Sequence, residues 1–348
     1  MKLARENGLS GALLDRLELT PARLASMIEG VRAIASQDDP LVAIKSWVRS
    51  DGLRISKQAV PLGVIAVIYE SRPNVTADAA ALALRSGNAV LLRGGKEAAF
   101  SNQAISDIFS AVISEAGLSA PIVQQVLSGD RTLVDAMLQA EGQIDLLIPR
   151  GGESLIRAVA EKSRVPVLKH YNGICHLYVD SSADLQKAEA VILNAKIQRP
   201  GVCNALETLL LHKDVAQHLL EKLAQHVELE LRLDLAEEDW NTEYLDTILS
   251  VRIVESMDEA VDHIARYSSA HTDGILSQSR EHIERFVRLV DSSAVVVNAS
   301  TRFNDGAEFG MGAEIGISTD RLHARGPVGA AELTTYKFIV EGDGHIRS

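Results

Sequence analysis

The chain has 348 residues, of which 46% are hydrophobic and 24% are charged. These proportions match folded globular proteins, and the length corresponds to about two domains, which excludes a disordered or collagen-like chain. Lys and Arg total 35 against 47 Asp and Glu, and the resulting net charge of -12 disfavours binding to a nucleic-acid backbone. We therefore expect a globular protein of about two domains that does not bind nucleic acid.

The sequence predicts neither a membrane segment nor a secretion signal. The longest apolar run, 60–69, is about half of the ~20 residues that span a bilayer. Residues 1–14 lack an apolar core and a cleavage site, so we expect a cytoplasmic protein. The two cysteines, Cys175 and Cys203, are too few for a disulfide framework or a cysteine-rich zinc site, and we expect no metal.

The two ends of the chain carry elements that stand apart from the rest. Thr20-Pro21, a hydroxyl cap followed by proline, predicts the start of a helix. Residues 47–60 alternate apolar and polar side chains around a Ser-Asp-Gly turn, which is typical of a β-hairpin, and 333–340 predicts a last strand. Because isolated ribbons are unstable, we expect hairpin and strand to join each other and to pair with another subunit.

Between these ends, short apolar runs alternate with longer helical patterns, which predicts two α/β domains with parallel sheets. In the first region the expected strands are 64–69, 89–93, 122–127 and 144–149, with helices from about Thr76, Ala98 and Thr132. In the second region the expected strands are 176–180, 207–212, 250–254 and 294–298, with helices at 185–197 and from Val215 and Met257.

Glycine follows three strands of the first region and precedes helices. The positions are Gly94-Gly95, Ser128-Gly129 and Gly151-Gly152. Glycine lets a ligand approach the backbone there, and a helix N-terminus favours anions, so the repetition indicates phosphate binding. The alternative for each single position is a tight turn that uses glycine for steric reasons alone.

Cys203 is the candidate nucleophile. It follows Arg-Pro-Gly-Val in a polar, turn-rich setting, where Arg199 and a helix beginning near Asn204 would favour the reactive thiolate. The alternative is a small buried hydrophobic residue, which is our interpretation of Cys175 at the start of an apolar strand.

Long segments of the sequence carry a family resemblance. The segments are 61–98, 144–156, 194–212 (NAKIQRPGVCNALETLLLH), 292–329 and 332–340. Together they resemble the gamma-glutamyl phosphate reductases, the glutamate-5-semialdehyde dehydrogenases of proline biosynthesis, which belong to the aldehyde dehydrogenase superfamily. Relative to that family the chain begins late and is short between Glu230 and Glu238.

The resemblance implies an α/β, aldehyde dehydrogenase-like fold with a Rossmann-type cofactor domain, an α/β catalytic domain and a small β oligomerisation module. The NADP-binding domain is expected at 1–45 and 61–168 with about 318–332, the catalytic domain with Cys203 at 169–317, and the module at 46–60 and 333–348. A homo-oligomer, dimer or tetramer, and an association with glutamate 5-kinase are also implied.

The resemblance also implies roles for individual residues. Cys203 is the catalytic thiol, and Asn74 holds the oxyanion together with the backbone N–H of Cys203, a task that needs preorganised donors. Judged from the residues alone, Asn74 is as well explained as a turn residue after proline. Glu243 matches the glutamate that contacts the nicotinamide ribose, with an exposed acidic residue before a strand as the alternative.

The expected cofactor is NADP(H). The implied cofactor residues besides Glu243 are Arg93, Gly94, Gly95, Lys96, Gly151 and Gly152. Arg93 takes the place of the superfamily lysine that meets the adenosine ribose, and with Lys96 it provides two cations for a 2′-phosphate. The alternative is a solvated charge cluster that also includes Glu97.

One departure from the superfamily bears on the reaction. Hydrolytic aldehyde dehydrogenases carry a glutamate base where this chain has His170-Tyr171-Asn172-Gly173, so the sequence places no carboxylate there. An enzyme that exchanges its thioester with phosphate has no use for that base. The expected reaction is attack of Cys203 on L-glutamyl 5-phosphate, release of phosphate, and reduction of the thioester by NADPH to L-glutamate 5-semialdehyde.

Other residues and other functions remain candidates. Arg199, Arg302, His323 and Arg325 are candidates for binding the substrate carboxylate or the phosphate, with surface solvation as the alternative for each. The competing functions are a general NAD(P)-dependent aldehyde dehydrogenase and a noncatalytic oligomeric binding protein. A Cys-His hydrolase stays open as well, although the histidines nearest to Cys203 in sequence, His170 and His176, precede a separate strand.

Overall fold

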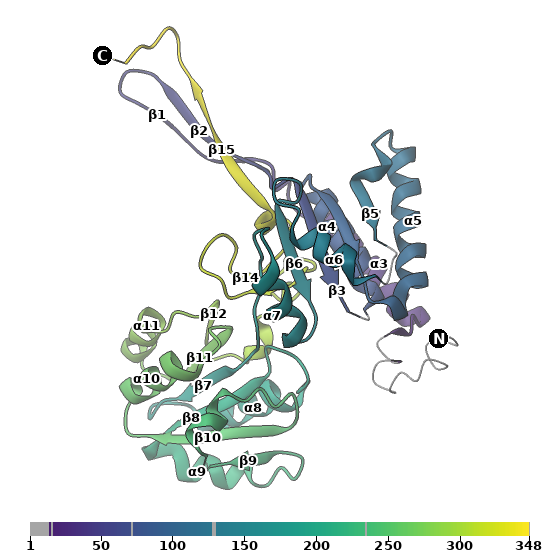
Figure 1. Ribbon diagram of the computed structural model, residues 1–348. Helices are drawn as coiled ribbons and strands as arrows, with labels where there is room; N and C mark the ends of the chain where they lie inside the picture. The colour runs from purple at the N-terminus through teal and green to yellow at the C-terminus, as the bar shows by residue number, and fades with distance from the viewer. Residues whose placement is uncertain (1–13, 15–16, 71, 127–129, 234, 348) are drawn as a thin grey trace. The chain divides into compact units, whose positions relative to one another are not determined.

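The computed structural model describes residues 14, 17–70, 72–126, 130–233 and 235–347 (Figure 1). The chain divides into two compact units. The first contains 1–169, 310–316 and 327–348, and the second contains 170–309 and 317–326. The expected domain boundaries instead placed 310–316 in the catalytic domain and about 318–326 in the cofactor domain. No helix in the described parts of the chain is long and apolar enough to cross a bilayer.

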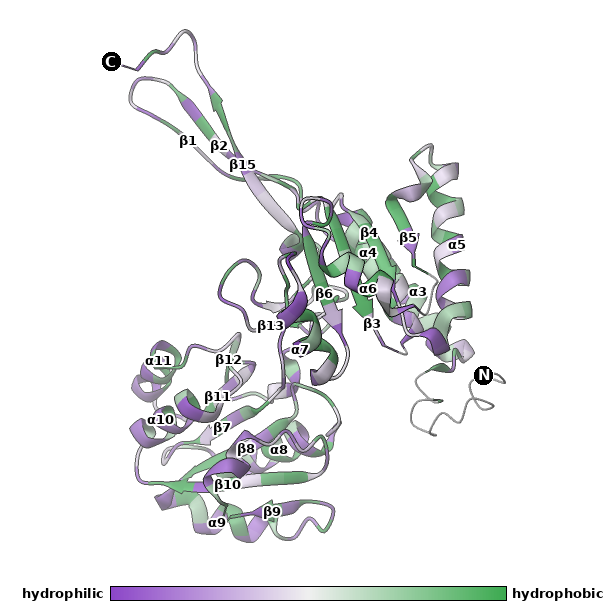
Figure 2. Ribbon diagram, viewed as in Figure 1, coloured by the Kyte–Doolittle hydropathy of each residue, from purple (hydrophilic) through white to green (hydrophobic). Residues whose placement is uncertain are grey.

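The first unit is built on a parallel four-stranded sheet with the order β5-β4-β3-β6. Its strands are β3 (Val64–Tyr69), β4 (Ala89–Arg93), β5 (Val123–Gln125) and β6 (Leu146–Arg150). Its helices are α3 (Pro21–Ala35), α4 (Pro73–Arg85), α5 (Ala99–Glu115), α6 (Arg131–Leu138) and α7 (Glu153–Lys162), with short turns η1 (Lys96–Ala98) and η2 (Ala120–Ile122). The strands β3, β4 and β6 are mostly green in Figure 2, because they are apolar runs buried between helices.

A second, antiparallel sheet belongs to the same unit. It contains β1 (Ala43–Val48), β2 (Arg54–Pro61) and β15 (Thr334–Glu341), the last of which follows the turn η5 (Ala331–Leu333), in the order β1-β2-β15. Gly52 takes a φ of 90° in the turn between β1 and β2, a conformation that glycine adopts without strain. The expectation that the hairpin and the last strand join each other is confirmed.

The second unit contains a parallel six-stranded sheet with the order β12-β11-β7-β8-β10-β9. Its strands are β7 (Cys175–Val179), β8 (Leu206–His212), β9 (Glu230–Arg232), β10 (Ile248–Val254), β11 (Thr272–Leu276) and β12 (Ala294–Val297). Its helices are α8 (Leu185–Ile197), α9 (Lys213–Leu223), α10 (Met257–Tyr267) and α11 (Arg280–Leu289), with turns η3 (Glu237–Asn241) and η4 (Thr301–Phe303). The short strands β13 (Ile317–Ser318) and β14 (Gly326–Pro327) pair with each other.

Helices cover both faces of this six-stranded sheet. Successive strand residues point to opposite faces, so Leu177 packs with α8 and α9, whereas Tyr178 packs with α10 and α11. The sequence-based prediction missed β11 and α11. The strand β11 reads Thr-Asp-Gly-Ile-Leu, and its Asp and Gly have low β-propensity, but all five residues are buried. Tertiary packing outweighs propensity in this strand.

Candidate active site

Cys203 lies in the turn between α8 and β8, at the amino end of the parallel strands. A helix beginning near Asn204 would have favoured the thiolate, but the chain instead turns at Cys203 and enters β8 at Leu206. The Asn204 side chain, which is buried, instead donates hydrogen bonds to the carbonyl oxygens of Arg302 and Asn304, at 3.3 and 3.0 Å. The turn is therefore held by side-chain bonds and not by helix capping.

The backbone of Cys203 is fixed against the segment that leads into β7. A Cβ atom on Gly173 would lie 1.9 Å from the Cys203 carbonyl oxygen, so only glycine permits this approach. The Cys175 thiol, fully buried, donates to the same carbonyl at 3.2 Å. The interpretation of Cys175 as a core residue is confirmed, while Cys203 is only half-buried.

Two histidines lie next to Cys203; from the sequence, His170 was considered only for a Cys-His hydrolase, and His271 was not named. One ligand atom each of Cys203, His170 and His271 lies within 4.8 Å of the other two. The imidazole rings of His170 and His271 contact edge to face, with centroids 5.2 Å apart. His170 precedes β7 and His271 precedes the unpredicted strand β11. Once β11 is recognised as the neighbour of β7, the position of both histidines before the amino ends of these strands predicts that they lie close together.

The electrostatics of this cluster favour the thiolate. Burial opposes ionisation of the Cys203 thiol, but the charge of His271 and a hydrogen bond from His170 outweigh it and hold the pKa well below its usual range. Among the described residues, the backbone N–H of Cys203 has no hydrogen-bond acceptor. The site thus combines an ionised sulfur with an uncommitted N–H donor next to it.

A carboxylate reaches the segment that the sequence showed without one. Glu243 comes from the stretch before β10, and its Oε1 accepts a hydrogen bond from the Gly173 backbone N–H at 2.9 Å. Burial raises the pKa of the Glu243 carboxyl group, with the hydrogen bond from Gly173 opposing it. The segment His170–Gly173 has no carboxylate of its own, but the expectation that none is available there is wrong, because the fold places the Glu243 carboxylate against it.

A buried ion pair supports the turn from both sides. Lys196 in the last turn of α8 and Glu207 in β8 are fully buried, with Nζ and Oε2 2.8 Å apart. Glu207 also accepts from the backbone N–H groups of Tyr244 and Leu245, next to Glu243. Burial raises the pKa of Glu207 to about 7 and lowers that of Lys196. Glu207 thereby ties the cysteine turn to the Glu243 segment.

The four candidate substrate-binding residues all lie in the second unit. Arg302 donates to Gln198 at 2.9 Å, and burial together with the neighbouring charge of Arg199 lowers its pKa. These two arginines therefore form a like-charged pair that an anion would relieve. Arg325 is bonded to the carboxylate and the carbonyl of Asp291, and His323 is exposed with a φ of 70°.

The candidate cofactor residues Arg93 to Lys96 and Gly151-Gly152 lie in the first unit at the carboxyl ends of β4 and β6. Strand order reverses between β3 and β6, and such a switch point is where dinucleotides bind in doubly wound sheets. Gly152 caps the ten-residue helix α7, and a Cβ there would meet nothing within 4 Å. The Arg93 Nε is buried without a partner among the described residues.

The other glycines of this region are explained in part by packing. A Cβ on Gly94 would lie 2.1 Å from the Asn102 Nδ2 and 2.9 Å from the Tyr69 ring. The expected turn Ser128-Gly129 lies outside the described residues. Lys96 is exposed at the start of η1.

Asn74 also belongs to the first unit, in the first turn of α4. It is exposed, and its side-chain amide donates to Asp78 at 3.2 Å. Burial raises the pKa of Asp78 to about 6, with the hydrogen bond from Asn74 opposing the shift. An amide on the surface at a helix start suits an oxyanion donor and suits the turn residue equally.

Comparisons with known proteins agree with the resemblance. The model of the aldehyde dehydrogenase family matches residues 17–239. A gamma-glutamyl phosphate reductase of Geobacter metallireducens is 50% identical over 363 aligned residues, covering 100% of this chain and 87% of its own length. Crystal structures of gamma-glutamyl phosphate reductase from Thermotoga maritima (47% identity, TM-score 0.96, covering 100% and 88%) and Saccharomyces cerevisiae (31%, 0.51, 100% and 86%) are also similar. These similarities confirm the expected family and α/β fold.

Proposed function

Since this chain belongs to the aldehyde dehydrogenase family and, within it, to the gamma-glutamyl phosphate reductases, we propose that it reduces L-glutamyl 5-phosphate to L-glutamate 5-semialdehyde with NADPH, a step of L-proline biosynthesis. The observation that carries the proposal is the Cys203 thiol held between His170 and His271. A depressed thiol pKa is what a covalent mechanism at neutral pH requires.

In the first step the Cys203 sulfur attacks the acyl carbon of the substrate. The C–S bond forms, the bond to phosphate breaks, and inorganic phosphate leaves as a thioester remains on Cys203. One of the two histidines, His170 or His271, takes up the thiol proton before attack, and both favour the ionised sulfur. The backbone N–H of Cys203 stabilises the oxyanion, with Asn74 proposed as the second donor.

The nicotinamide cofactor fits the first unit. The N-terminus of α7 at Gly152, whose backbone N–H donates to Glu70 in this structure, would hold the pyrophosphate in place of that carboxylate. The buried, unpaired Nε of Arg93 would meet the adenosine ribose with Lys96 nearby. When bound, NADPH supplies the hydride that turns the thioester into a thiohemiacetal. Collapse of the thiohemiacetal releases the aldehyde and returns the Cys203 thiolate, which His170 and His271 again stabilise.

The anionic ends of the substrate have a matching pair of cations. Arg199 and Arg302 lie close enough to lower the pKa of Arg302, and the Cys203 thiolate acts on the same guanidinium. We assign these two arginines to the substrate carboxylate or the phosphate, since arginine binds either group through two parallel hydrogen bonds. Arg325 is engaged by Asp291 and is the weaker candidate.

A reverse assay tests the proposal. The purified protein is given L-glutamate 5-semialdehyde and NADP⁺, with and without phosphate, and NADPH formation is followed by absorbance. We expect turnover that requires phosphate, because phosphate must cleave the thioester. Equal turnover without phosphate would contradict the reductase, and activity with NAD⁺ equal to that with NADP⁺ would contradict the roles of Arg93 and Lys96.

The Glu243 carboxylate favours a second candidate, hydrolytic oxidation of an aldehyde. Its hydrogen bond to Gly173 holds a carboxylate against the segment where hydrolytic relatives carry their base. The variant Glu243→Gln separates the two, since the amide can still accept from Gly173 but cannot activate water. Phosphate-independent NADPH formation that disappears in Glu243→Gln identifies the hydrolytic enzyme; the proposed reductase keeps its phosphate-dependent turnover, with altered affinity for NADP⁺.

We also propose that the three-stranded sheet mediates a homo-oligomer. Both outer strands carry exposed apolar side chains, including Trp47 on β1 and Phe338 on β15, whose rings lie 6.3 Å apart. Exposed strand edges with apolar faces are typical of assembly surfaces. Light scattering of the native chain and of Phe338→Glu tests this; a monomer in both cases contradicts it.

A further inference from the structure

Three side chains of the kinds that bind transition metals converge in the second unit. The Cys203 sulfur and one ring nitrogen each of His170 and His271 lie within 4.8 Å of one another, and no other such group of three or more is found among the described residues. The three residues come from the amino ends of β8, β7 and β11. Their spacing in the sequence therefore predicts no metal site, and we expected none from the cysteine count.

The outer nitrogen of each histidine is already engaged. His170 Nδ1 lies 2.8 Å from the carbonyl oxygen of Ile317, and because a carbonyl only accepts, the proton sits on Nδ1. His271 Nδ1 lies 2.8 Å from the Thr272 hydroxyl, which can accept the ring proton. A neutral ring with its proton on Nδ1 presents the lone pair of Nε2, so this arrangement suits both residues as ligands. Metal-binding histidines show this arrangement, an outer-shell acceptor that fixes ring and tautomer.

One of these nitrogens has no other use within the described residues. His271 is fully buried, and its Nε2 has no hydrogen-bond partner there. Buried polar atoms in native proteins are nearly always bonded, so a buried nitrogen without a partner, on a residue of this cluster, calls for a ligand. A single imidazole suffices to take the proton of a catalytic thiol, and the second imidazole is left to be explained.

We propose that Cys203, His170 and His271 bind one Zn²⁺ per chain, reversibly, and that the bound metal blocks the nucleophile. Zinc takes one thiolate and two imidazoles with Zn–S and Zn–N bonds of about 2.3 and 2.0–2.1 Å, which places the ligand atoms about 3.4–3.6 Å apart. The ligand atoms, at most 4.8 Å apart, must approach by no more than about 1.4 Å to reach that geometry. Three protein ligands leave the fourth position to water.

The binding step releases one proton and involves no oxidation. The Zn–S bond replaces the S–H bond, or, where the thiol proton already sits on a histidine, a Zn–N bond replaces that N–H bond. Either proton goes to solvent, so binding strengthens as pH rises. The metal binding depends on the geometry alone, while its inhibition of turnover rests on the proposed function.

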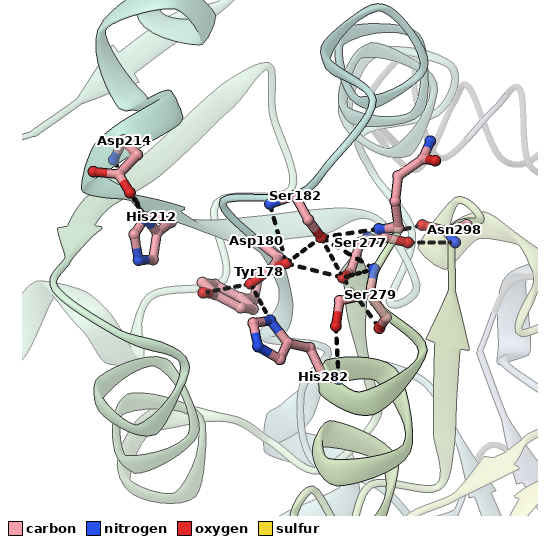
Figure 3. Close-up of polar contacts among 10 residues, drawn as sticks. Tyr178, Asp180, Ser182, His212, Asp214, Ser277, Ser279, His282 and Asn298 are labelled. Carbon is pink, nitrogen blue, oxygen red and sulfur yellow. Dashed lines mark hydrogen bonds and ion pairs between the residues drawn. The ribbon is translucent and has the colours of Figure 1, made fainter.

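The polar cluster around Asp180, at the opposite edge of the same sheet, is not the metal site, because its acceptors already have protein donors (Figure 3). There the Asp180 carboxylate accepts from the hydroxyls of Ser182 and Ser277 and contacts His282 Nδ1 at 2.9 Å. Its lone pairs are thus already satisfied by protein donors. A cation would have to break these bonds, whereas at Cys203 it meets a nitrogen without a partner.

Cadmium titration tests the site without relying on turnover. The full chain, freed of metal by a chelator and kept reduced, is titrated with Cd²⁺ while the ultraviolet charge-transfer band of a cadmium–thiolate bond is followed. We expect one equivalent in the native chain and in the control Cys175→Ser, and no band in Cys203→Ser. His170→Asn and His271→Asn keep a donor at the Nδ1 position but lose Nε2, and should weaken binding by at least about tenfold.

Two results would overturn the site. One is a band of equal strength in Cys203→Ser, and the other is undiminished affinity in both histidine variants, which would mean that sulfur alone holds the metal. If a histidine variant does not fold, NMR of the ring nitrogens in the native chain decides instead. Binding of Zn²⁺ must then shift Nε2 of both His170 and His271, and unchanged resonances contradict the proposal.

The link to function is measured separately. Added Zn²⁺ should protect Cys203 from alkylation by iodoacetamide and should stop the phosphate-dependent reaction, with a chelator restoring both. Protection without any turnover to inhibit would remove the proposed function and leave the metal site intact. Inhibition without protection would place the metal elsewhere and contradict the inference.

Discussion

The two edges of the six-stranded sheet in the second unit differ in how far their polar side chains are hydrogen-bonded. At the carboxyl edge, Asp180 after β7 and Ser277 after β11 belong to a network in which side chains satisfy one another (Figure 3). At the amino edge, Cys203, His170 and His271 face each other, and His271 Nε2 is left without a partner among the described residues. The polar groups at the carboxyl edge are hydrogen-bonded to one another, whereas a buried nitrogen at the amino edge has no partner among the described residues.

The difference runs against a general rule of α/β proteins. Ligands usually bind outside the carboxyl ends of parallel strands, and the proposed cofactor residues Gly152 and Arg93 of the first unit lie at such ends. In the second unit the carboxyl edge has a cavity of about 200 Å³ lined by Tyr178 and Asp180 among others, but their polar atoms are committed. We therefore place the proposed chemistry of the second unit at the edge where a buried polar group lacks a partner, and not at the carboxyl edge.

Replacing the nucleophile is the strongest test of the comparison. Cys203→Ser should lower kcat of the phosphate-dependent reaction by at least about 10⁴-fold, because a serine hydroxyl stays protonated where a thiol ionises. The matched control Cys175→Ser removes the other thiol and keeps a donor for the Cys203 carbonyl. Substantial activity in Cys203→Ser, or its loss in the control alone, would place the chemistry elsewhere.

Removing one histidine should change the pH dependence of the thiol. The depressed pKa keeps the thiolate in the native protein as pH falls below about 8.5, until pH reaches the folded-state value. In His170→Asn the hydrogen bond from His170 is lost while the charge of His271 remains, so the pKa of the Cys203 thiol should rise and the thiolate should be lost at a higher pH than in the native protein. We expect kcat at pH 7 to drop by about 10²–10⁴-fold.

The rate of Cys203 alkylation against pH measures this change. His170→Gln serves as the matched control, since its amide lies nearer to the Nε2 position, whereas Asn imitates Nδ1 and preserves the bond to Ile317. An alkylation profile of His170→Asn that coincides with the native one would show that the histidine does not set the thiol pKa.

Variants of the buried ion pair between Lys196 and Glu207 test how much this pair stabilises the amino edge. Glu207→Leu or Lys196→Met alone should lower the free energy of unfolding by about 3–5 kcal/mol, because each leaves a buried polar group without its partner. The double variant Lys196→Met/Glu207→Leu should recover most of that loss. Urea titrations of the four proteins close the cycle; additive losses would mean that the pair is not coupled.

The carboxyl edge should respond in stability and not in rate. Asp180→Asn replaces an acceptor by a donor amid several hydroxyl donors and should lower the free energy of unfolding by about 1–3 kcal/mol. We expect kcat/KM to stay close to native. Asp184→Asn, at the N-cap of α8, is the control, as asparagine caps a helix equally well. A large loss of kcat/KM in Asp180→Asn would erase the distinction between the edges.

Some features of the chain could be predicted from the sequence because their signals are local. The helix at Thr20, the hairpin around Gly52 and the apolar strand 64–69 each have capping, turn or burial patterns confined to a few neighbouring residues. Cys203 stood out for a similar reason, as a thiol in a polar turn. The partners of Cys203 could not be found this way, because β11 contains Asp273 and Gly274, which are uncommon in strands, and its sequence therefore did not indicate a buried strand.

The sequence by itself determined two α/β units and the family, and it singled out the candidate nucleophile, since these depend on periodicity and on residues adjacent in the chain. Only the tertiary structure decided which groups surround the sulfur. Parallel strands joined by long crossovers bring residues 170, 203 and 271 to one edge and place the Glu243 carboxylate on Gly173. The thiol pKa follows from that convergence in a buried site, because burial and nearby charge act through space and not along the chain.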